Sequence, residues 1–260
     1  MVCASAEKSR YAGAIEMRRF FVLPGSVVGE RVILDQEESH HLVRVLRLQQ
    51  GETVELFDGT GALYTAKIEQ LGKQVEVSLE SRQQPVVGKQ GGVTLCQGEL
   101  KGGKMDFLVE KCTELGVRRL IPFFAGRSQG RLDDARLRQR QQRRMSIVKK
   151  ACKQSGRLRF MRVDEEVNYG ELLSLDFGSS HSKIILWEKA EGSTLAEAIG
   201  KDRDSPVCLM IGPEGGFSDE EAEQALASGW QQASLGDQIL RAETAAISAV
   251  AIVNHLLGRM

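Results

Sequence analysis

Two glycine-containing segments near the C-terminus have the residue types and the spacing of ligand-binding loops. The first glycine loop is residues 211–218 (IGPEGGFS), and the second glycine loop is residues 235–244 (LGDQILRAET). Each follows a short strand-like apolar run, 207–211 or 233–235, and each leads into a helix-like stretch. Open α/β sheets bind ligands where loops leave the carboxyl ends of parallel strands, so loops from neighbouring strands can wall one pocket. The pair therefore indicates an enzyme.

The residues of the first glycine loop suit a ligand without phosphate groups. Ser218 and Glu221 have the spacing of a capping box, which predicts that a helix begins there with its amide groups facing the loop. Its glycines permit close approach of a ligand to the backbone, and Glu214 could accept hydrogen bonds from a ribose or an amine. The loop lacks Gly-Lys-Ser/Thr and does not match Gly-x-Gly-x-x-Gly, which disfavours phosphate binding. An adenosine-like ligand fits better, and an ordinary strand-to-helix turn is the alternative.

The second glycine loop carries two charged candidates for catalysis. Arg241 and Glu243 flank Ala242, directly before a helix expected over 244–257. That helix is apolar almost all round, so it must be buried in the core or against another subunit. At the mouth of a ligand loop we favour a functional role for Arg241, with a structural ion pair to Glu243 as the alternative.

A strongly basic segment extends from residue 126 to residue 162, in a chain whose formal net charge is zero. The middle of this segment has the spacing of a helix. Charge runs are commonly solvated faces, but this local imbalance favours a surface for a polyanion, most simply nucleic acid. Its cations are Arg127, Arg131, Arg136, Arg138, Arg140, Arg143, Arg144, Lys149, Lys150, Lys153, Arg157, Arg159 and Arg162, against Asp133 and Asp134.

The elements that must position these residues fall into two groups. Residues 18–82 alternate as strands do, with a hairpin signal at 58–61 (DGTG) and one helix expected over 37–48, whose Leu42, Val45 and Leu46 share a side. Residues 85–92 are typical of a linker. Strand-like and helix-like stretches then alternate, with a helix from Lys104 and strands at 93–96, 119–123, 160–163, 183–187, 207–211 and 233–235. This order predicts an α/β fold with a mainly parallel sheet.

Composition excludes several other classes of protein. Five scattered cysteines without a Cys-x-x-Cys pair disfavour zinc sites and disulfide frameworks and suit reduced core thiols of a cytoplasmic protein. The four histidines have no metal-ligand spacing, so we expect no metal. No apolar run approaches the roughly 20 residues of a membrane span. Residues 1–16 lack a signal-peptide core and are a disordered extension or an over-called start.

In combination these residues resemble the bacterial 16S ribosomal RNA uridine-N3 methyltransferases of the SPOUT (α/β-knot) class. The matching pieces include 18–22 (RRFFV), 40–47 (HHLVRVLR), Lys101, 111–117 (KCTELGV), 154–157 (QSGR) and both glycine loops. The family pattern has an arginine where this chain has Gln238 and a proline where it has Met161. The likeness covers nearly the whole chain from Met17.

The resemblance implies a PUA-like RNA-binding β-barrel at 17–84, the linker 85–92, and a trefoil-knot methyltransferase domain at 93–260. It also implies a homodimer formed through the C-terminal helix, and 16S ribosomal RNA or the small ribosomal subunit as partner. Its cofactor is S-adenosylmethionine, lying between the glycine loops with 186–188 as a third side. The implied cofactor residues are Leu186, Trp187, Glu188, Ile211, Gly212, Pro213, Glu214, Gly215, Gly216, Leu235, Gly236, Ile239, Leu240, Arg241, Thr244 and Ala245.

Catalytic and RNA-binding roles follow from the resemblance together with the charges. Arg241 would stabilise negative charge on the uracil oxygens, and Glu243 would accept the N3 proton or orient Arg241. The predicted RNA contacts are Arg18, Arg19, Arg44, Arg47, Lys101, Arg127, Arg131, Arg144 and Arg157. The alternatives are a related enzyme that methylates a ribose 2′-hydroxyl or transfer RNA, and a non-catalytic RNA-binding assembly factor.

Overall fold

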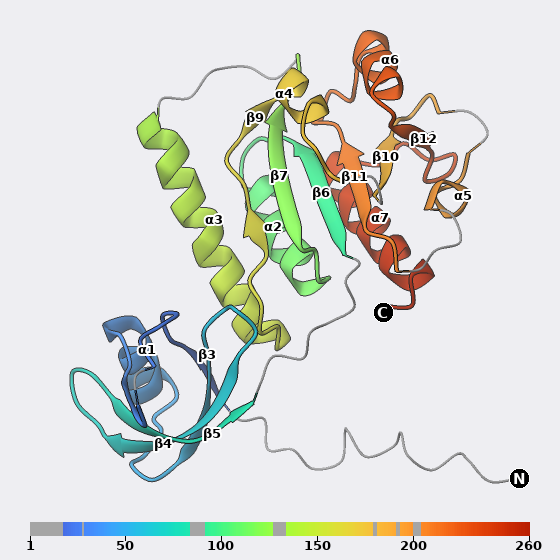
Figure 1. Cartoon of the computed structure of the whole chain (residues 1–260). Coiled ribbons are helices and arrows are strands. Elements are labelled where there is room, and N and C mark those ends of the chain that lie inside the picture. Colours follow the sequence, from blue (N-terminus) through green and yellow to red (C-terminus); the bar gives the residue numbers. More distant parts are fainter. Residues whose placement is uncertain are drawn as a thin grey trace, which may run out of the picture. The chain divides into compact units, whose positions relative to one another are not determined.

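The structure is a computed structural model of the whole chain (Figure 1), which divides into two compact units, residues 1–85 and 86–260. It describes residues 18–27, 29–83, 92–126, 134–178, 181–190, 193–199 and 204–260. The expected extension at 1–16 and most of the expected linker at 85–92 lie outside the described residues. Within the described residues, no helix is long and apolar enough to cross a membrane, and no cluster of three or more side chains could hold a metal.

The first unit is built on a five-stranded sheet in the order β1-β3-β4-β5-β2. Its strands are β1 (Arg19–Phe21), β2 (Arg31–Ile33), β3 (Thr53–Phe57), β4 (Leu63–Gln70) and β5 (Glu76–Gln83). β3 and β4 form the antiparallel hairpin that the glycines at 58–61 predict. β1 lies parallel to β3. Alternate residues such as Val54, Leu56, Ala66 and Ile68 are buried in one core, as expected for strands with one buried face.

The helix expected over 37–48 is shorter and changes its winding. α1 (Gln36–His40) continues into a π-helical turn, η1 (His41–Val45), which closes with a hydrogen bond of 3.0 Å from Leu46 N–H to the His41 carbonyl. This i→i+5 turn is wider than an α-turn, so the spacing of 3.6 residues no longer applies. Leu42 is fully buried, whereas Val45 is 59% exposed. The two residues that the sequence places on one side of a helix therefore differ in burial.

The second unit contains seven strands that pair only in parallel, in the order β12-β10-β11-β6-β7-β8, with β9 also on β7. They are β6 (Val93–Gly98), β7 (Arg119–Phe124), β8 (Arg162–Val163), β9 (Val167–Asn168), β10 (Ser182–Leu186), β11 (Val207–Ile211) and β12 (Gln231–Ala233). The predicted parallel sheet is confirmed, and the predicted strands match to within a few residues. The last is displaced most, since β12 ends at Ala233 and Ser234 forms an isolated bridge with Thr194.

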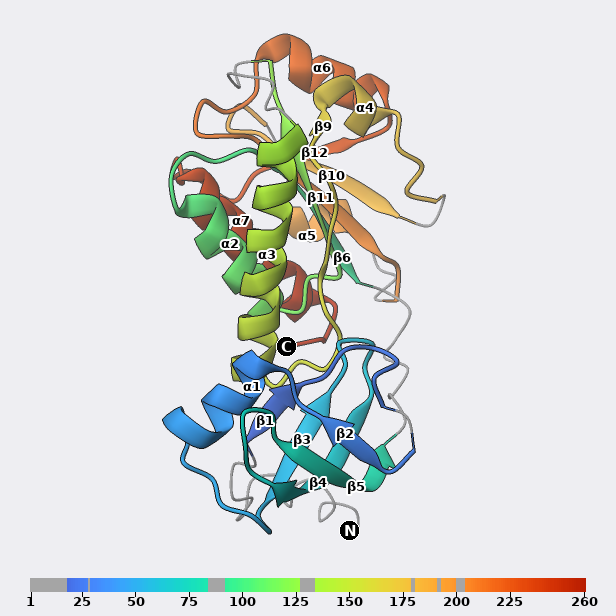
Figure 2. The same ribbon diagram turned by 90° about the vertical axis from the view of Figure 1, so that its left-hand side faces the viewer.

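Helices cover both faces of this sheet (Figures 1 and 2). They are α2 (Lys104–Glu114), α3 (Asp134–Ser155), α4 (Tyr169–Leu173), α5 (Leu195–Ile199), α6 (Asp219–Ala227) and α7 (Ala242–Leu256). α2 packs against α3 and α7, and α7 also packs on β6 and β11. On the opposite face, Tyr169 and Leu172 of α4 and Ala225 of α6 share a core with Cys96 and Met210. The sheet is therefore buried on both faces, as parallel sheets are.

Four cysteines lie within the described residues, and all four are buried and free. They are Cys96, Cys112, Cys152 and Cys208. Their environment agrees with the expected reduced core thiols, which behave as small apolar side chains.

Candidate active site

The two glycine loops wall one cavity at the carboxyl end of the parallel sheet. They follow β11 and β12, the strands that flank β10 in the sheet. The cavity has a volume of about 400 Å³, within the range of small-molecule sites. It is lined by Lys104, Leu186, Trp187, Glu188, Ile211, Gly212, Pro213, Glu214, Gly215, Gly216, Phe217, Ala233, Ser234, Leu235, Gly236, Asp237, Gln238, Ile239, Leu240, Arg241, Ala242 and Ala245. The structure thus brings together all the residues named as cofactor-binding except Thr244, which does not line the cavity.

The first glycine loop is held by its own helix cap. Glu221 N–H donates to Ser218 Oγ at 3.2 Å, and Ser218 N–H donates to Glu221 Oε2 at 2.9 Å. This confirms the predicted capping box. The remaining oxygen of the Glu221 carboxylate accepts from Gly126 N–H at 2.7 Å. The cap is therefore tied to the end of β7 as well as to α6.

The end of β6 contacts the first glycine loop and supports it. Gln97 is fully buried, and its Nε2 donates to the Gly212 carbonyl at 3.0 Å. A Cβ on Gly98 would lie 2.4 Å from Pro213 N and 2.8 Å from the Gly212 carbonyl carbon. Real Cβ atoms do not approach backbone so closely, so glycine at 98 is what lets the loop sit on the end of β6.

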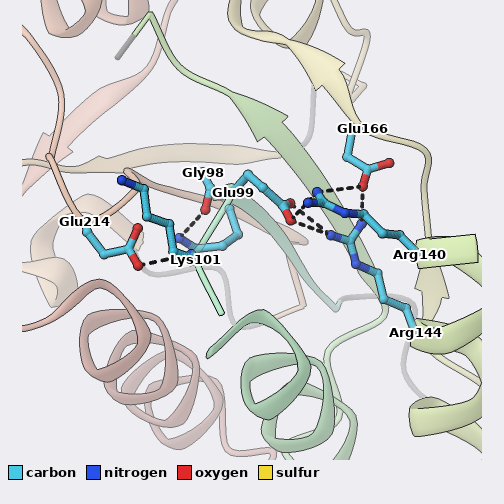
Figure 3. A network of polar contacts seen from close by, with 8 residues as sticks. Gly98, Glu99, Lys101, Arg140, Arg144, Glu166 and Glu214 are labelled. Atoms are coloured by element: carbon cyan, nitrogen blue, oxygen red, sulfur yellow. Dashed lines mark hydrogen bonds and ion pairs between the residues drawn. The ribbon is translucent and has the colours of Figure 1, made fainter. Parts of the chain in front are cut away.

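Glu214 is held in place rather than left free to meet a ligand. Its Oε1 accepts from Lys101 N–H at 3.1 Å and from Lys104 Nζ at 3.2 Å (Figure 3 shows the first of these contacts). Desolvation raises the pKa of the Glu214 carboxyl, but these hydrogen bonds outweigh it and leave the pKa below its usual value. The role first expected for Glu214, acceptance of hydrogen bonds from a ligand, is thus partly taken by the chain itself.

The second glycine loop is more exposed. Ser234 Oγ accepts from Gly236 N–H at 3.1 Å. Beyond it, no hydrogen bond or ion pair within the described part of the chain involves residues 237–240. Ile239 lines the cavity although it is 88% exposed. Little in the protein itself therefore fixes this segment.

Arg241 and Glu243 stand at the beginning of α7. Arg241 is the N-cap residue and is exposed, and Glu243 lies in the first helical turn. The helix thus begins at Ala242, two residues before the expected start. Glu243 Oε2 is buried without a hydrogen bond, and Lys104 Nζ lies 3.9 Å from it. The structure pairs Glu243 with Lys104. The alternative from the sequence was an ion pair between Glu243 and Arg241.

The predicted RNA contacts have different environments. In the first unit Arg18, Arg44 and Arg47 are exposed, whereas Arg19 pairs with Glu55 at 2.5 Å. In the second unit Lys101 is exposed. Arg127 and Arg131 lie outside the described residues.

The prediction for Arg144 is wrong. This side chain is only 3% exposed, and it donates to both oxygens of Glu99 at 2.9 Å and to Glu166 Oε1 at 2.8 Å. Arg140 joins the same network at 3.0 Å from Glu99 Oε1 (Figure 3). Burial raises the pKa of the Glu99 carboxyl, and the two guanidinium groups act against that rise. A buried arginine with two carboxylate partners has no free face for a phosphate.

Arg157 also has a structural environment instead of the predicted one. Its Nη1 and Nη2 donate to the carbonyls of Thr113 and Val117 at 2.9 and 2.7 Å, and its Nε donates to the Arg159 carbonyl at 2.6 Å. It thereby satisfies a carbonyl in the last turn of α2, where a helix leaves acceptors unpaired. The exposed cations of α3, such as Arg138 and Lys150, remain available to a polyanion.

Comparison with known proteins agrees with this site. An RNA methyltransferase domain model matches residues 89–254, and an RNA methyltransferase PUA domain model matches residues 34–80. The ribosomal RNA small subunit methyltransferase E of Synechocystis sp. is 30% identical over 92% of this chain and 78% of its own length. The chain belongs to this family of RNA methyltransferases. Its first unit accordingly contains a PUA domain.

Two further relatives support the assignment. The ribosomal RNA small subunit methyltransferase E of Bacillus subtilis is 28% identical over 84% of this chain and 88% of its own length. The Neisseria gonorrhoeae ribosomal RNA small subunit methyltransferase E, crystallised bound to S-adenosyl methionine, matches with a TM-score of 0.81. The match is 33% identical and covers 92% of this methyltransferase and 98% of that chain.

Lys104 is the cavity-lining cation that the predicted cofactor set lacks, and that set also lacks Phe217, Ala233, Ser234, Asp237, Gln238 and Ala242. Lys104 was identified only as the start of a helix, and nothing in its spacing indicates a carboxylate 110 residues away. Gly102 and Gly103 before it were the only local signal, because glycines allow a loop to turn closely into a helix.

Proposed function

We propose that this methyltransferase transfers the methyl group of S-adenosylmethionine to N3 of a uridine in small-subunit (16S) ribosomal RNA. The observation that carries the proposal is the single cavity walled by both glycine loops at the carboxyl end of the parallel sheet. Its size suits a cofactor with one nucleoside, and the carboxylates of Glu188, Glu214 and Asp237 suit a ligand with cationic and hydroxyl groups. The relatives named above supply the RNA class.

The glycines explain how such a cofactor would be cradled. Gly216 has φ +65°, and a Cβ there would meet Glu188 Oε1 at 3.0 Å. A Cβ on Gly212 would likewise lie 3.1 Å from the carbonyl carbon of Gly216. Side chains at these positions would fill the space that backbone groups of the loop need to reach the ligand. The remaining cofactor contacts that we propose are those of the predicted set that line the cavity.

The chemistry required of the protein is alignment and proton removal. When bound, S-adenosylmethionine supplies a methyl group on positively charged sulfur, which needs no further activation. The uracil N3 proton passes to Glu243, the N3 electron pair forms the bond to the methyl carbon, and the electrons of the broken S–C bond stay on sulfur. Arg241 stabilises the negative charge that develops on the uracil oxygens. Since N3 of a paired base is inaccessible, the target uridine is unpaired or flipped out.

The exposed basic residues would hold the RNA by its phosphates. We retain Arg18, Arg44, Arg47 and Lys101 as contacts, and we add the outward residues of α3, such as Arg138 and Lys150. Phosphate contacts fix orientation without reading sequence, so affinity should fall steeply with added salt. The predicted trefoil-knot threading, the domain limits and a cytoplasmic location remain part of this proposal.

We also propose that the chain acts as a homodimer through α7. Ile252 of α7 is 40% exposed and Phe107 of α2 is 48% exposed, and these two helices pack together. A second copy that covers them would bury apolar surface. Sedimentation equilibrium should show a dimer that Ile252→Glu weakens, whereas a monomeric wild type would contradict it.

The function is tested by mapping methylated uridine in ribosomal RNA from a strain that lacks this protein. We expect N3-methyluridine to be lost at one position of the small-subunit RNA and restored by the wild-type chain. Loss of a ribose or transfer-RNA methyl group instead would favour a related methyltransferase activity. An unchanged methylation map, with no calorimetric binding of S-adenosylmethionine, would favour the assembly factor.

A further inference from the structure

Lys104 lines the cavity and lies between two carboxylates, that of Glu214, which also lines the cavity, and that of Glu243, which does not. Lys104 is the first residue of α2, and its side chain is 38% exposed. Its Nζ is 3.2 Å from Oε1 of Glu214 in the first glycine loop and 3.9 Å from Oε2 of Glu243 in α7. One ammonium group thus faces carboxylates that are carried by two separate loop-and-helix segments.

Glu243 needs such a partner more than Glu214 does. The Glu243 side chain is 15% exposed, and its Oε2 is buried without a hydrogen bond. A buried carboxylate oxygen without a partner is costly, and a cation within about 4 Å lowers that cost. Glu214 by contrast also accepts from Lys101 N–H. At 3.9 Å the Lys104 ammonium is an ion-pair partner of Glu243 and is too far away for a direct hydrogen bond.

The other charges around Glu243 do not replace Lys104. Arg241 is two residues away in the chain, but it is exposed at the N-cap and no ion pair joins it to Glu243 within the described residues. Glu214 is anionic and would repel Glu243 if Lys104 did not lie between them. The amide groups in the first turn of α7 favour an anion but are shared along that turn.

We propose that Lys104 is a positioning residue for methyl transfer, which orients the Glu243 carboxylate towards the uracil N3 proton and ties the first glycine loop to α7 through Glu214. This deepens the proposed function and rests on it. Lys104 takes no part in the proton transfer. The N3 proton goes to Glu243 and then to water, so the lysine acts through geometry and charge.

The test compares Lys104→Met with Lys104→Arg and with the control Lys111→Met. Lys111 lies on the same helix and pairs with Glu110 and Glu114 away from the cavity. We expect Lys104→Met to lower kcat about 100-fold, the lower end of the effect of a positioned acid or base. KM for RNA should change much less. Lys104→Arg keeps a cation at the site, so its kcat should be at least about tenfold higher than that of Lys104→Met. Lys111→Met should behave as the wild type.

A double-mutant cycle separates positioning from a general structural role. If Lys104 acts through Glu243, Lys104→Met should lower kcat much less in the Glu243→Gln variant than it does in the wild type. Independent, multiplicative losses would overturn the proposal. So would a wild-type kcat for Lys104→Met, a pure loss of cofactor affinity, or no rescue by arginine.

The wild-type arm distinguishes this proposal from the function on which it rests. If the wild type binds S-adenosylmethionine but methylates no RNA, the proposed function fails. If the wild type is active and the cycle shows no coupling, only the role of Lys104 fails. Should Lys104→Met not fold, the cycle is run with Lys104→Gln, which keeps a polar side chain of similar reach.

Discussion

The two glycine loops line the same cavity but differ in how the protein holds them. In the first, Ile211, Gly212, Pro213 and Phe217 are buried, and the loop is fixed by the helix cap and by β6. In the second, residues 236–239 are all exposed. The first loop is therefore built before any ligand arrives, whereas the second has few contacts to lose when it moves. Such a pair can admit a cofactor and then close over it.

The largest expected effect is a loss of turnover. It comes from a substitution in the second glycine loop that should leave stability unchanged. Arg241→Ala should lower turnover about 100- to 1000-fold, the loss seen when one preorganised donor to a developing anion is removed. Because Arg241 is exposed, the melting temperature should stay close to wild type, and calorimetry should show that S-adenosylmethionine still binds. Methylation assays that show near-normal turnover would remove Arg241 from the mechanism.

A substitution beneath the first loop should reduce stability instead. Gly98→Ala places a Cβ 2.4 Å from Pro213 N, so the loop must shift at a cost of about 1–3 kcal/mol. For a chain of this size each kcal/mol lowers Tm by about 2–4 °C. The control is Gly103→Ala, where a Cβ meets nothing within 4 Å. Equal melting temperatures for the two variants would argue against a preformed first loop.

The corresponding glycine of the second loop should matter less. Gly236 has φ +115°, a conformation that suits glycine, but a Cβ there meets no atom within 4 Å. Gly236→Ala should therefore cost about 1 kcal/mol of backbone strain, which this exposed segment with few contacts can partly relieve. Thermal unfolding beside Gly98→Ala measures the difference. A loss as large as that of Gly98→Ala would mean that the second loop is as constrained as the first.

Acid should weaken the first loop through Glu214. Its pKa is lowered in the folded protein, so it contributes stability above its ordinary value of 4.5 and loses that contribution as the pH falls below it. Between pH 6 and pH 3, on the order of the range spanned by such a titration, Tm should fall more for the wild type than for Glu214→Gln. Parallel curves would show that the contacts with Lys101 and Lys104 do not stabilise the loop.

The smallest effect on stability is expected at the tip of the second loop. Ile239 is 88% exposed, so Ile239→Ser should change the free energy of unfolding by less than about 0.5 kcal/mol. The affinity of this variant for S-adenosylmethionine should nevertheless fall, since the Ile239 side chain lines the cavity. Calorimetry that gives the wild-type affinity would show that the tip does not close on the cofactor.

Local signals in the sequence predicted most of the fold and the walls of the site. Residues that are close in sequence determine the capping box at Ser218 and Glu221, the hairpin glycines, and the alternation of strands with helices along the chain. The two glycine loops were identified in the same way, whereas their individual cofactor residues followed from the resemblance to a known family.

Contacts between distant parts of the chain could not be predicted. Arg144 looked like one more cation of a basic helix, but its partners Glu99 and Glu166 are 45 and 22 residues away. The pairing of Lys104 with Glu214 spans 110 residues. The π-helical turn at His41–Val45 likewise depends on how its segment packs, because its residues fit an ordinary helix equally well.

The most direct test of the two-loop account is hydrogen exchange with and without S-adenosylmethionine. In the free protein, amides of residues 211–217 should already be protected and those of 235–240 should exchange quickly. On cofactor binding, 235–240 should gain protection while 211–217 change little. If the cofactor binds and neither loop changes, or if the first loop is the one that becomes ordered, the account is contradicted.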